Sequence, residues 1–230
     1  KAERRYREWC SGNRLMLSPL CDVADLAPIA VDDLMLPPIL EGFGDRPDGH
    51  LPPTIIGFFS QLKQEYVSAR YMLHQGLAST RPHFSDREVT LTDTLDYPLY
   101  SLASERVRTG FRVAYSLLDK IAFFVDRYWA LGKRPERISF KNVWFKEGRT
   151  TLLASLDEMP NLALRGLYWI SKDLFDEDLR KTVAPDARQL NAIRNALEHG
   201  YLRVTEGWAE PFNLDRDRSD AFGLRIDSDE

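Results

Sequence analysis

Helical periodicity over two long stretches constrains the fold of this chain more than any other feature of its sequence. Apolar residues recur at three- and four-residue steps over residues 53–77 and again over residues 98–131. This spacing predicts two long helices, each with an apolar face. Pro53 and Thr54 are start signals for the first helix, and Gly132 is a natural stop for the second. Long amphipathic helices bury their apolar faces against other helices, which favours a helical bundle.

Two shorter helices are predicted further along the chain. One covers about residues 162–179. The other begins near Pro185, because proline suits the first turn of a helix, and it runs to His199. Residues 134–149 contain Pro135 together with β-branched and aromatic residues, so they predict a loop. Four helices with one long insertion indicate an all-α bundle.

The two ends of the chain differ in residue pattern from the helical part, residues 51–205. Residues 1–50 are punctuated by prolines and glycines but carry large apolar clusters, so they predict an irregular arm that packs on the bundle. Residues 206–230 are acidic, contain several arginines and have poor periodicity, which is typical of a surface tail. The first residue is not a methionine, so we expect the chain to be part of a longer product.

The composition limits the ways in which this chain can meet other molecules. Its formal net charge is -4, whereas a protein that coats nucleic acid through bulk electrostatics is usually basic. A nucleic-acid partner must therefore meet a local patch. No apolar run approaches the roughly 18 residues of a membrane span, and the sequence contains no glycine-rich phosphate loop and no zinc-ligand pattern. We expect a cytoplasmic protein without membrane contact, metal or cofactor.

The end of the fourth predicted helix gathers the side chains best suited to chemistry. At about 100° per residue, Asn195 and His199 share one face of the helix, and so do Arg194 and Glu198. The long side chain of Arg194 can bend around Asn195 toward the same cleft as His199. A histidine in the last turn of a helix lies where the helix dipole favours its protonated form, which suits a general acid near neutral pH.

These groups suit the cleavage of RNA without a metal ion. One group must deprotonate the ribose 2′-hydroxyl, another must stabilise the pentavalent phosphate, and a third must protonate the leaving 5′-oxygen. An imidazole serves as acid or base, and a guanidinium clamps a phosphate through two parallel hydrogen bonds. The spacing alone favours an ordinary helix end, in which Arg194 and Glu198 form a solvated pair worth about 0.3–0.5 kcal/mol and His199 has no catalytic role.

The string Arg194-x4-His199-x-Tyr201, with Asn195 directly after the arginine, resembles the signature of the HEPN superfamily, the higher eukaryotes and prokaryotes nucleotide-binding domains. Glu198 departs from the pattern, because many relatives carry an apolar residue before the histidine. The resemblance also extends upstream. Residues 9–22, 117–124 and 164–169 are similar to a bacterial HEPN subfamily that is often joined to tetratricopeptide-type repeats.

Membership would imply a four- or five-helix bundle that forms a homodimer through the motif-bearing helices. Two copies of Arg194 and His199 would then line one composite cleft and act as the catalytic residues of a metal-independent endoribonuclease. Many such relatives are toxins or antiviral effectors, so a sensor domain or an antitoxin is an expected partner. Other relatives only bind nucleotides or act as scaffolds. A non-catalytic dimerisation or nucleotide-binding module in a larger assembly is therefore the alternative.

Several residues are expected to support the motif. Asn195 would orient the site, and Glu198 would either tune His199 or repel phosphate. Asp119 lies among apolar residues of the second predicted helix, so it either pairs with Arg194 or belongs to a solvated stripe. Tyr201 would border the cleft. It matches a tyrosine that, in one toxin branch of the superfamily, a partner nucleotidyltransferase modifies. Simple packing at the helix end is the favoured interpretation.

Basic and aromatic side chains complete the set of candidates. We expect Lys120, Arg188 and Arg203 to bind RNA. Further basic residues either form a local positive rim or are ordinary surface charges: Arg106, Arg108, Arg112, Arg180 and Lys181. The aromatic residues fit core packing better than base stacking, because they recur at helical spacing: Tyr128, Trp129, Phe140, Trp144 and Trp169.

Overall fold

The structure is a computed structural model, and it describes residues 1–18, 31–36, 54–89, 99–146, 151–153, 160–176, 185–205 and 223–227. Most of these residues are helical. The α-helices are α1 (Ala2–Gly12), α2 (Thr54–Leu77), α3 (Leu102–Tyr128), α5 (Leu162–Phe175) and α7 (Pro185–His199), and the short 3₁₀ helices are η2 (Phe84–Asp86) and η3 (Pro135–Arg137). The strands are β1 (Tyr201–Thr205) and β2 (Gly223–Asp227). The predicted all-α fold class is confirmed, with a small sheet added.

The four predicted helices lie where their periodicity places them, with two differences at their ends. Helix α5 ends at Phe175 instead of near residue 179, and residues 177–179 lie outside the described residues. The other difference is at the start of α3. Its sequence pattern begins near residue 98, whereas the helix begins at Leu102. The reason is a cap. The side chain of Ser101 accepts a hydrogen bond from the backbone N–H of Ser104, at 3.1 Å, and so satisfies one of the donors that a helix start leaves unpaired.

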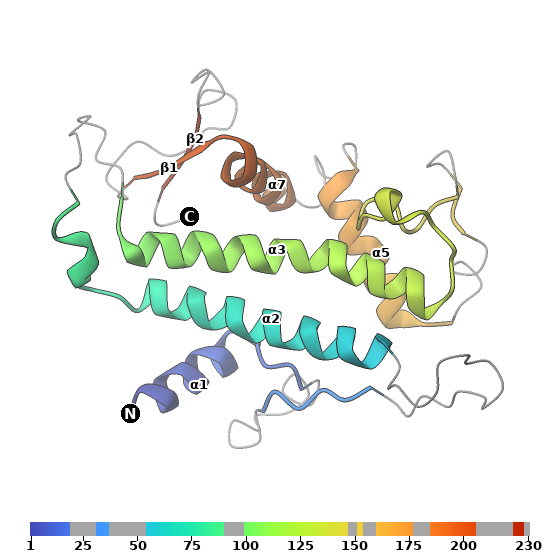
Figure 1. The fold of residues 1–230 in the computed structure, drawn as a ribbon, viewed down its shortest axis with the longest axis horizontal. Coiled ribbons are helices and arrows are strands. Elements are labelled where there is room, and N and C mark those ends of the chain that lie inside the picture. The colour runs from blue at the N-terminus through green and yellow to red at the C-terminus, as the bar shows by residue number, and fades with distance from the viewer. Residues whose placement is uncertain are drawn as a thin grey trace.

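The antiparallel helices α2 and α3 lie side by side along most of their length (Figure 1). Two buried glycines let their backbones approach closely. A Cβ atom added at Gly110 of α3 would lie 2.9 Å from the carbonyl oxygen of Ala69, and one added at Gly76 of α2 would lie 2.7 Å from that of Ala103. Neither these helices nor any other helix in the described residues is long and apolar enough to cross a membrane.

Substituting Gly110 with alanine is expected to lower the free energy of unfolding by about 1–3 kcal/mol, because the added methyl group meets backbone that cannot move aside. Gly166→Ala is the matched control. Gly166 lies in the exposed part of α5, where an added Cβ atom would meet open space, so alanine should stabilise the helix by about 0.5–1 kcal/mol. Urea unfolding of both variants measures the difference. Equal stabilities would contradict close packing at Gly110.

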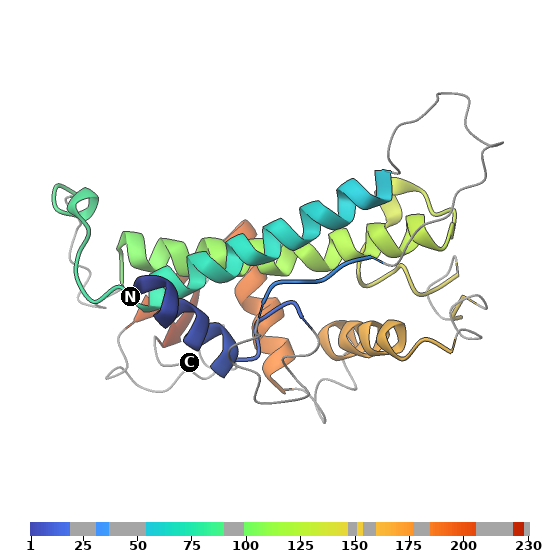
Figure 2. The same cartoon turned by 90° about the horizontal axis from the view of Figure 1, so that it is seen from below.

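Helices α5 and α7 cross α3 instead of running alongside it. Figure 1 looks almost down the axis of α7, and Figure 2, turned by 90°, shows it running across the α2–α3 pair. Helix α7 contacts α3, α5 and both strands. Figure 1 shows α2 and α7 on opposite sides of α3. The end of α7, where the sequence motif lies, is therefore positioned chiefly by α3 and the sheet.

The loop after α3 supplies the largest buried side chains of the described chain. Phe140, Val143 and Trp144 are 0–1% exposed and pack against the C-terminal half of α3 and against α5. The indole Nε1 of Trp144 donates to the carbonyl oxygen of Phe140 at 2.6 Å. Core packing is thus confirmed for these two aromatic residues, whereas Tyr128 and Trp169 are 45% and 55% exposed.

The arm differs from the irregular segment that its sequence predicts, because it begins with helix α1. The prolines that indicated irregular structure start only at Pro19. The helix before them carries two ion pairs at i, i+4 spacing, Glu3 with Arg7 and Arg4 with Glu8, which is the spacing that supports a helix. The prediction of an irregular arm is therefore wrong for Ala2–Gly12.

The tail also differs from its prediction, because part of it forms a strand. Strand β2 pairs in parallel with β1, with Leu202 opposite Leu224 and Val204 opposite Ile226. Leu202 is 6% exposed and packs with the end of α7. Residues 223–227 are thus part of the fold, and the prediction of a surface tail is wrong for them. The pairing joins segments far apart in sequence, so local periodicity does not reveal it.

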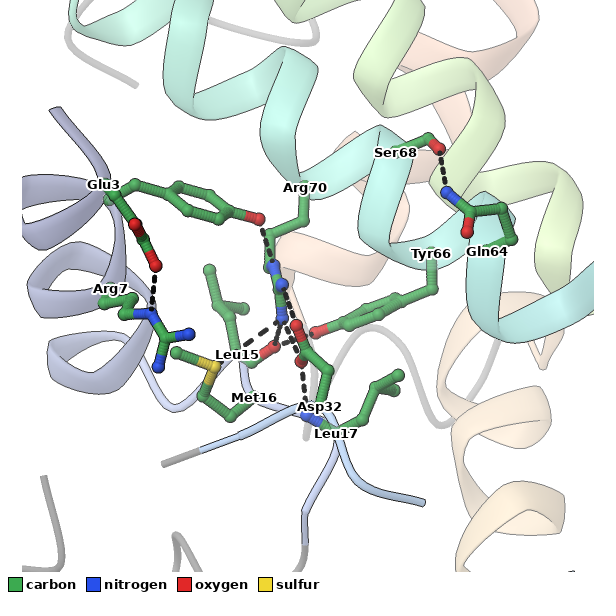
Figure 3. Close-up of polar contacts among 11 residues, drawn as sticks. Glu3, Arg7, Leu15, Met16, Leu17, Asp32, Gln64, Tyr66, Ser68 and Arg70 are labelled. Atoms are coloured by element: carbon green, nitrogen blue, oxygen red, sulfur yellow. Dashed lines mark hydrogen bonds and ion pairs between the residues drawn. The ribbon is translucent and has the colours of Figure 1, made fainter. Parts of the chain in front are cut away.

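Arg70 of α2 ties the arm to the bundle, as Figure 3 shows. Its side chain is only 3% exposed and forms a two-pronged ion pair with Asp32, with N···O distances of 2.8 and 2.6 Å. It also donates to the carbonyl oxygen of Leu15 at 2.6 Å and to the hydroxyl of Tyr6 at 2.8 Å. The hydrogen bond from Arg70 holds the pKa of Asp32 below its ordinary value, against the effect of burial.

Candidate functional site

Two arginines of α3 fix the end of α7 and the start of β1. The guanidinium of Arg112 donates to the carbonyl oxygen of Leu197 at 3.0 Å, and that of Arg108 donates to the carbonyl oxygen of Leu202 at 3.1 Å. Carbonyls in the last turn of a helix lack backbone partners, and a cation there also complements the helix dipole. These two contacts therefore hold the turn that carries His199 in one place on α3.

Arg194 lies between an aromatic ring of α3 and the amide of its own neighbour. Its guanidinium carbon is 5.9 Å from the ring centroid of Tyr115, within the range of a cation–π contact. The hydroxyl of Tyr115 donates in turn to the side-chain oxygen of Asn191, at 3.3 Å. Nη1 of Arg194 donates to the side-chain oxygen of Asn195 at 3.0 Å. Arg194 is thus drawn around the helix toward the face that Asn195 shares with His199.

The rest of the motif faces solvent. Asn195, Glu198 and His199 are exposed, and Arg194 is half-buried. Among the residues that the structure describes, no ion pair joins Arg194 to Glu198, and Arg194 contacts Asn195 instead. An arginine with part of its donor set free can bind a phosphate. An exposed imidazole one turn further along the helix can exchange protons with a bound substrate.

Strand β1 places two further side chains beside the motif. Tyr201 and Arg203 are two residues apart on the strand and so point to the same side, and the guanidinium carbon of Arg203 lies 5.8 Å from the ring centroid of Tyr201. The hydroxyl of Tyr201 forms a short hydrogen bond with that of Tyr100. This hydrogen bond, together with burial, raises the pKa of Tyr100. The backbone N–H of Leu99 donates to the carbonyl oxygen of Val204 at 2.8 Å and fixes the segment that carries Tyr100.

A comparison with protein families decides the class of the chain. The model of the LA2681-like HEPN family matches residues 47–230, from the end of the arm through the motif to the last residue. The chain belongs to the LA2681-like HEPN family. No curated protein and no solved structure matches it significantly. Helix α1 lies outside the matched region, so the contact between α1 and α2 is a feature beyond the family match.

Two candidates of this HEPN protein lie away from the motif. Asp119 is exposed and accepts a hydrogen bond at 2.8 Å from the backbone N–H of Phe140, so it holds the loop after α3 and not Arg194. Lys120 forms an ion pair with Glu65 of α2, with an N···O distance of 2.5 Å, and so faces α2 and not α7. The support role for Asp119 and the RNA contact for Lys120 both lack structural support. The side chain of Arg188 lies outside the described residues.

The residues that surround Arg194 in this HEPN fold have only weak signals in the sequence. Tyr115 occupies one position of an amphipathic helix, and Asn191 lies three residues before Arg194, on the same face of α7. Neither forms a motif. Arg108 and Arg112 are visible in the sequence as candidates for a positive rim, but in the structure each donates to a backbone carbonyl. Only the crossing of α7 over α3 brings these groups together.

Within the described residues, no group of three or more His, Cys, Asp and Glu side chains is arranged to hold a metal ion. Glu198 is the acidic residue next to His199 in sequence, and it is exposed. The side chains of Arg194 and His199 themselves can supply phosphate binding by a guanidinium and proton transfer by an imidazole.

Proposed function

We propose that this HEPN protein is a metal-independent endoribonuclease that acts on RNA in the cytoplasm. The observation that carries the proposal is the placement of Arg194. Its contacts with Tyr115 and Asn195 direct a half-buried guanidinium toward the helix face that carries His199. Family membership adds support, because HEPN domains are commonly ribonucleases or nucleotide-binding modules.

In the proposed reaction, the 2′-oxygen of a ribose attacks the adjacent phosphorus while the bond to the 5′-oxygen breaks. An imidazole removes the proton of the 2′-hydroxyl, and an imidazolium gives a proton to the leaving 5′-oxygen. Arg194 stabilises the charge on the pentavalent phosphate. The products are a 2′,3′-cyclic phosphate and a 5′-hydroxyl. Two His199 side chains, one from each copy of a homodimer, would divide the roles of base and acid.

Exposure of the motif supports a dimer through α7. Asn195, Glu198 and His199 are exposed in the single chain. A second copy packed on this end of α7 would enclose the two motifs in one cleft. We further propose a toxin or antiviral role controlled by a sensor domain, a tetratricopeptide-type repeat or an antitoxin.

The residues around Arg194 and His199 take positioning and binding roles in this proposal. Tyr115 holds the guanidinium of Arg194 by its ring, and Asn195 orients it through the 3.0 Å hydrogen bond. Tyr201 and Arg203 form the border of the cleft at β1, where Arg203 binds phosphates that flank the cleaved bond. Arg188 lies on the same helix as the motif, so we propose it as a further RNA contact.

The proposal predicts cleavage of single-stranded RNA in the presence of excess EDTA, with 2′,3′-cyclic phosphate and 5′-hydroxyl ends. The physical reason is that an imidazole and a guanidinium supply all the groups that the reaction needs. End-labelled RNA resolved on a gel, with and without phosphatase and kinase treatment, identifies the ends. Activity that EDTA abolishes and magnesium restores would contradict the mechanism. RNA binding without cleavage would favour the non-catalytic module, in which Glu198 beside His199 prevents turnover.

A further inference from the structure

A cavity of about 500 Å³ lies between α1, the C-terminal half of α2 and the start of α3. It shares no residue with the motif on α7 and β1. One of its walls, α1, also lies outside the region that matches the family. The side chains that define its chemistry are Glu3 and Tyr6 from α1, Tyr71, His74 and Gln75 from α2, and Arg106 from α3.

Aromatic rings form the wall between α1 and α2. The rings of Tyr71 and His74 are stacked, with centroids 6.4 Å apart and planes at 20°. Tyr6 contacts both of them edge-on, with centroids 5.1 Å from each, and the ring centroid of Trp9 lies 5.2 Å from that of His74. Tyr71 keeps 46% of its surface exposed. The cavity thus offers an accessible ring face, backed by a fixed cluster, to a planar ligand.

Two polar groups of the cavity residues have no partner among the described residues. The guanidinium of Arg106 has neither a hydrogen bond nor an ion pair there. The Nδ1 atom of His74 makes no hydrogen bond either, and neighbouring protein atoms cover it. Glu3, by contrast, is paired with Arg7 at 3.1 Å. A buried nitrogen without a partner is costly, and an unpaired guanidinium favours an anion.

We propose that this cavity binds a small ligand that combines a planar aromatic ring with a phosphate. The ring lies against Tyr71, and the phosphate binds the guanidinium of Arg106. Because the walls come from α1, α2 and α3, the bound ligand also ties the arm to the bundle. This binding is independent of RNA cleavage at the motif.

The test is isothermal titration calorimetry of the full chain with AMP, CMP and phenyl phosphate as probes, and with adenosine and inorganic phosphate as their separate halves. We expect saturable binding of at least one ring phosphate, and at least about tenfold weaker binding of either half alone. Arg106→Gln and Tyr71→Ala should each weaken that binding about tenfold or more. Arg165→Gln, an exposed arginine of α5, is the matched control and should leave it unchanged.

Two further measurements distinguish this site from the motif. His199→Ala should bind the probe as tightly as the unaltered protein, because the cavity contains no motif residue. A short single-stranded RNA without a terminal phosphate should not compete with the probe. No saturable binding of any ring phosphate at millimolar concentration would overturn the proposal. Equal affinity of Arg106→Gln and Arg165→Gln would overturn it as well, as would displacement of the probe by the RNA.

Discussion

Alanine in place of Arg194 or His199 is expected to lower the rate of RNA cleavage by about 10²- to 10⁴-fold while the protein stays folded. Loss of His199 removes the group that exchanges protons with the two ribose oxygens. Loss of Arg194 removes the charge that stabilises the pentavalent phosphate. Neither residue belongs to the core, since His199 is exposed and Arg194 is half-buried. The rates are compared by single-turnover cleavage of labelled RNA, with circular dichroism as the check on folding.

Conservative variants of the same residues sharpen this prediction. Arg194→Lys keeps the charge but loses the two parallel hydrogen bonds of a guanidinium, so we expect a loss smaller than that of alanine but still large. Tyr115→Phe keeps the ring that lies 5.9 Å from Arg194 and removes the hydroxyl that donates to Asn191, so it should retain most of the activity. Tyr115→Ala removes the ring and should raise KM and lower kcat together. Unchanged cleavage by His199→Ala would overturn the assignment of the site.

The sequence predicts the helices of this fold well because their signals are local. Apolar spacing marks α2 and α3, and Pro185 marks the start of α7, all within one or two turns of the chain. Helix α1 is not predicted, because the prolines that follow it indicate irregular structure for the whole of residues 1–50. The β1–β2 pair was hidden because a parallel pair is defined by two segments, Tyr201–Thr205 and Gly223–Asp227, that local patterning does not connect.

The candidate site shows the same division between local and long-range signals. The spacing of Arg194, Asn195 and His199 on one helix is visible in the sequence, and the structure keeps them at the exposed end of α7. The α3 residue that contacts Arg194 is not predictable in this way, because it depends on the angle at which α7 crosses α3. The sequence makes Asp119 a candidate partner of Arg194, because a carboxylate can pair with a guanidinium. In the structure the residue of α3 that contacts Arg194 is Tyr115, one turn earlier.

Asp32→Asn is expected to release the arm from α2 more readily than Arg70→Met, although both break the same ion pair. Loss of the carboxylate leaves the guanidinium of Arg70 buried, at 3% side-chain exposure, without a counter-charge. Breaking a buried pair in this way costs about 3–5 kcal/mol. Loss of the arginine leaves Asp32, which is 32% exposed and recovers water, so about 1–3 kcal/mol is expected. Asp33→Asn, its exposed neighbour, is the matched control.

Labelling of Cys10 measures arm release directly. The Cys10 thiol is fully buried, and burial raises its pKa, so it reacts with a thiol reagent only when the arm opens. In a Cys21→Ser background, a loss of about 3 kcal/mol in Asp32→Asn corresponds to roughly a hundredfold faster labelling. Arg70→Met should label more slowly than Asp32→Asn, and Asp33→Asn as slowly as the unaltered protein. The reverse order would contradict the ion pair as the anchor of the arm.

The same ion pair makes the docking of the arm depend on pH. The pKa of Asp32 in the folded state lies below its ordinary value of 3.8, chiefly because of the hydrogen bond from Arg70. The stabilisation is therefore complete above pH values near 3.8 and is lost as the pH falls through the folded-state pKa. Proteolysis of the arm by an acid protease should accelerate over this range in the unaltered protein. In Asp32→Asn the arm should already be cleaved rapidly at the upper end of the range, because a carboxamide does not titrate. If the rate of cleavage still depended on pH in that variant, the effect would belong to another carboxylate.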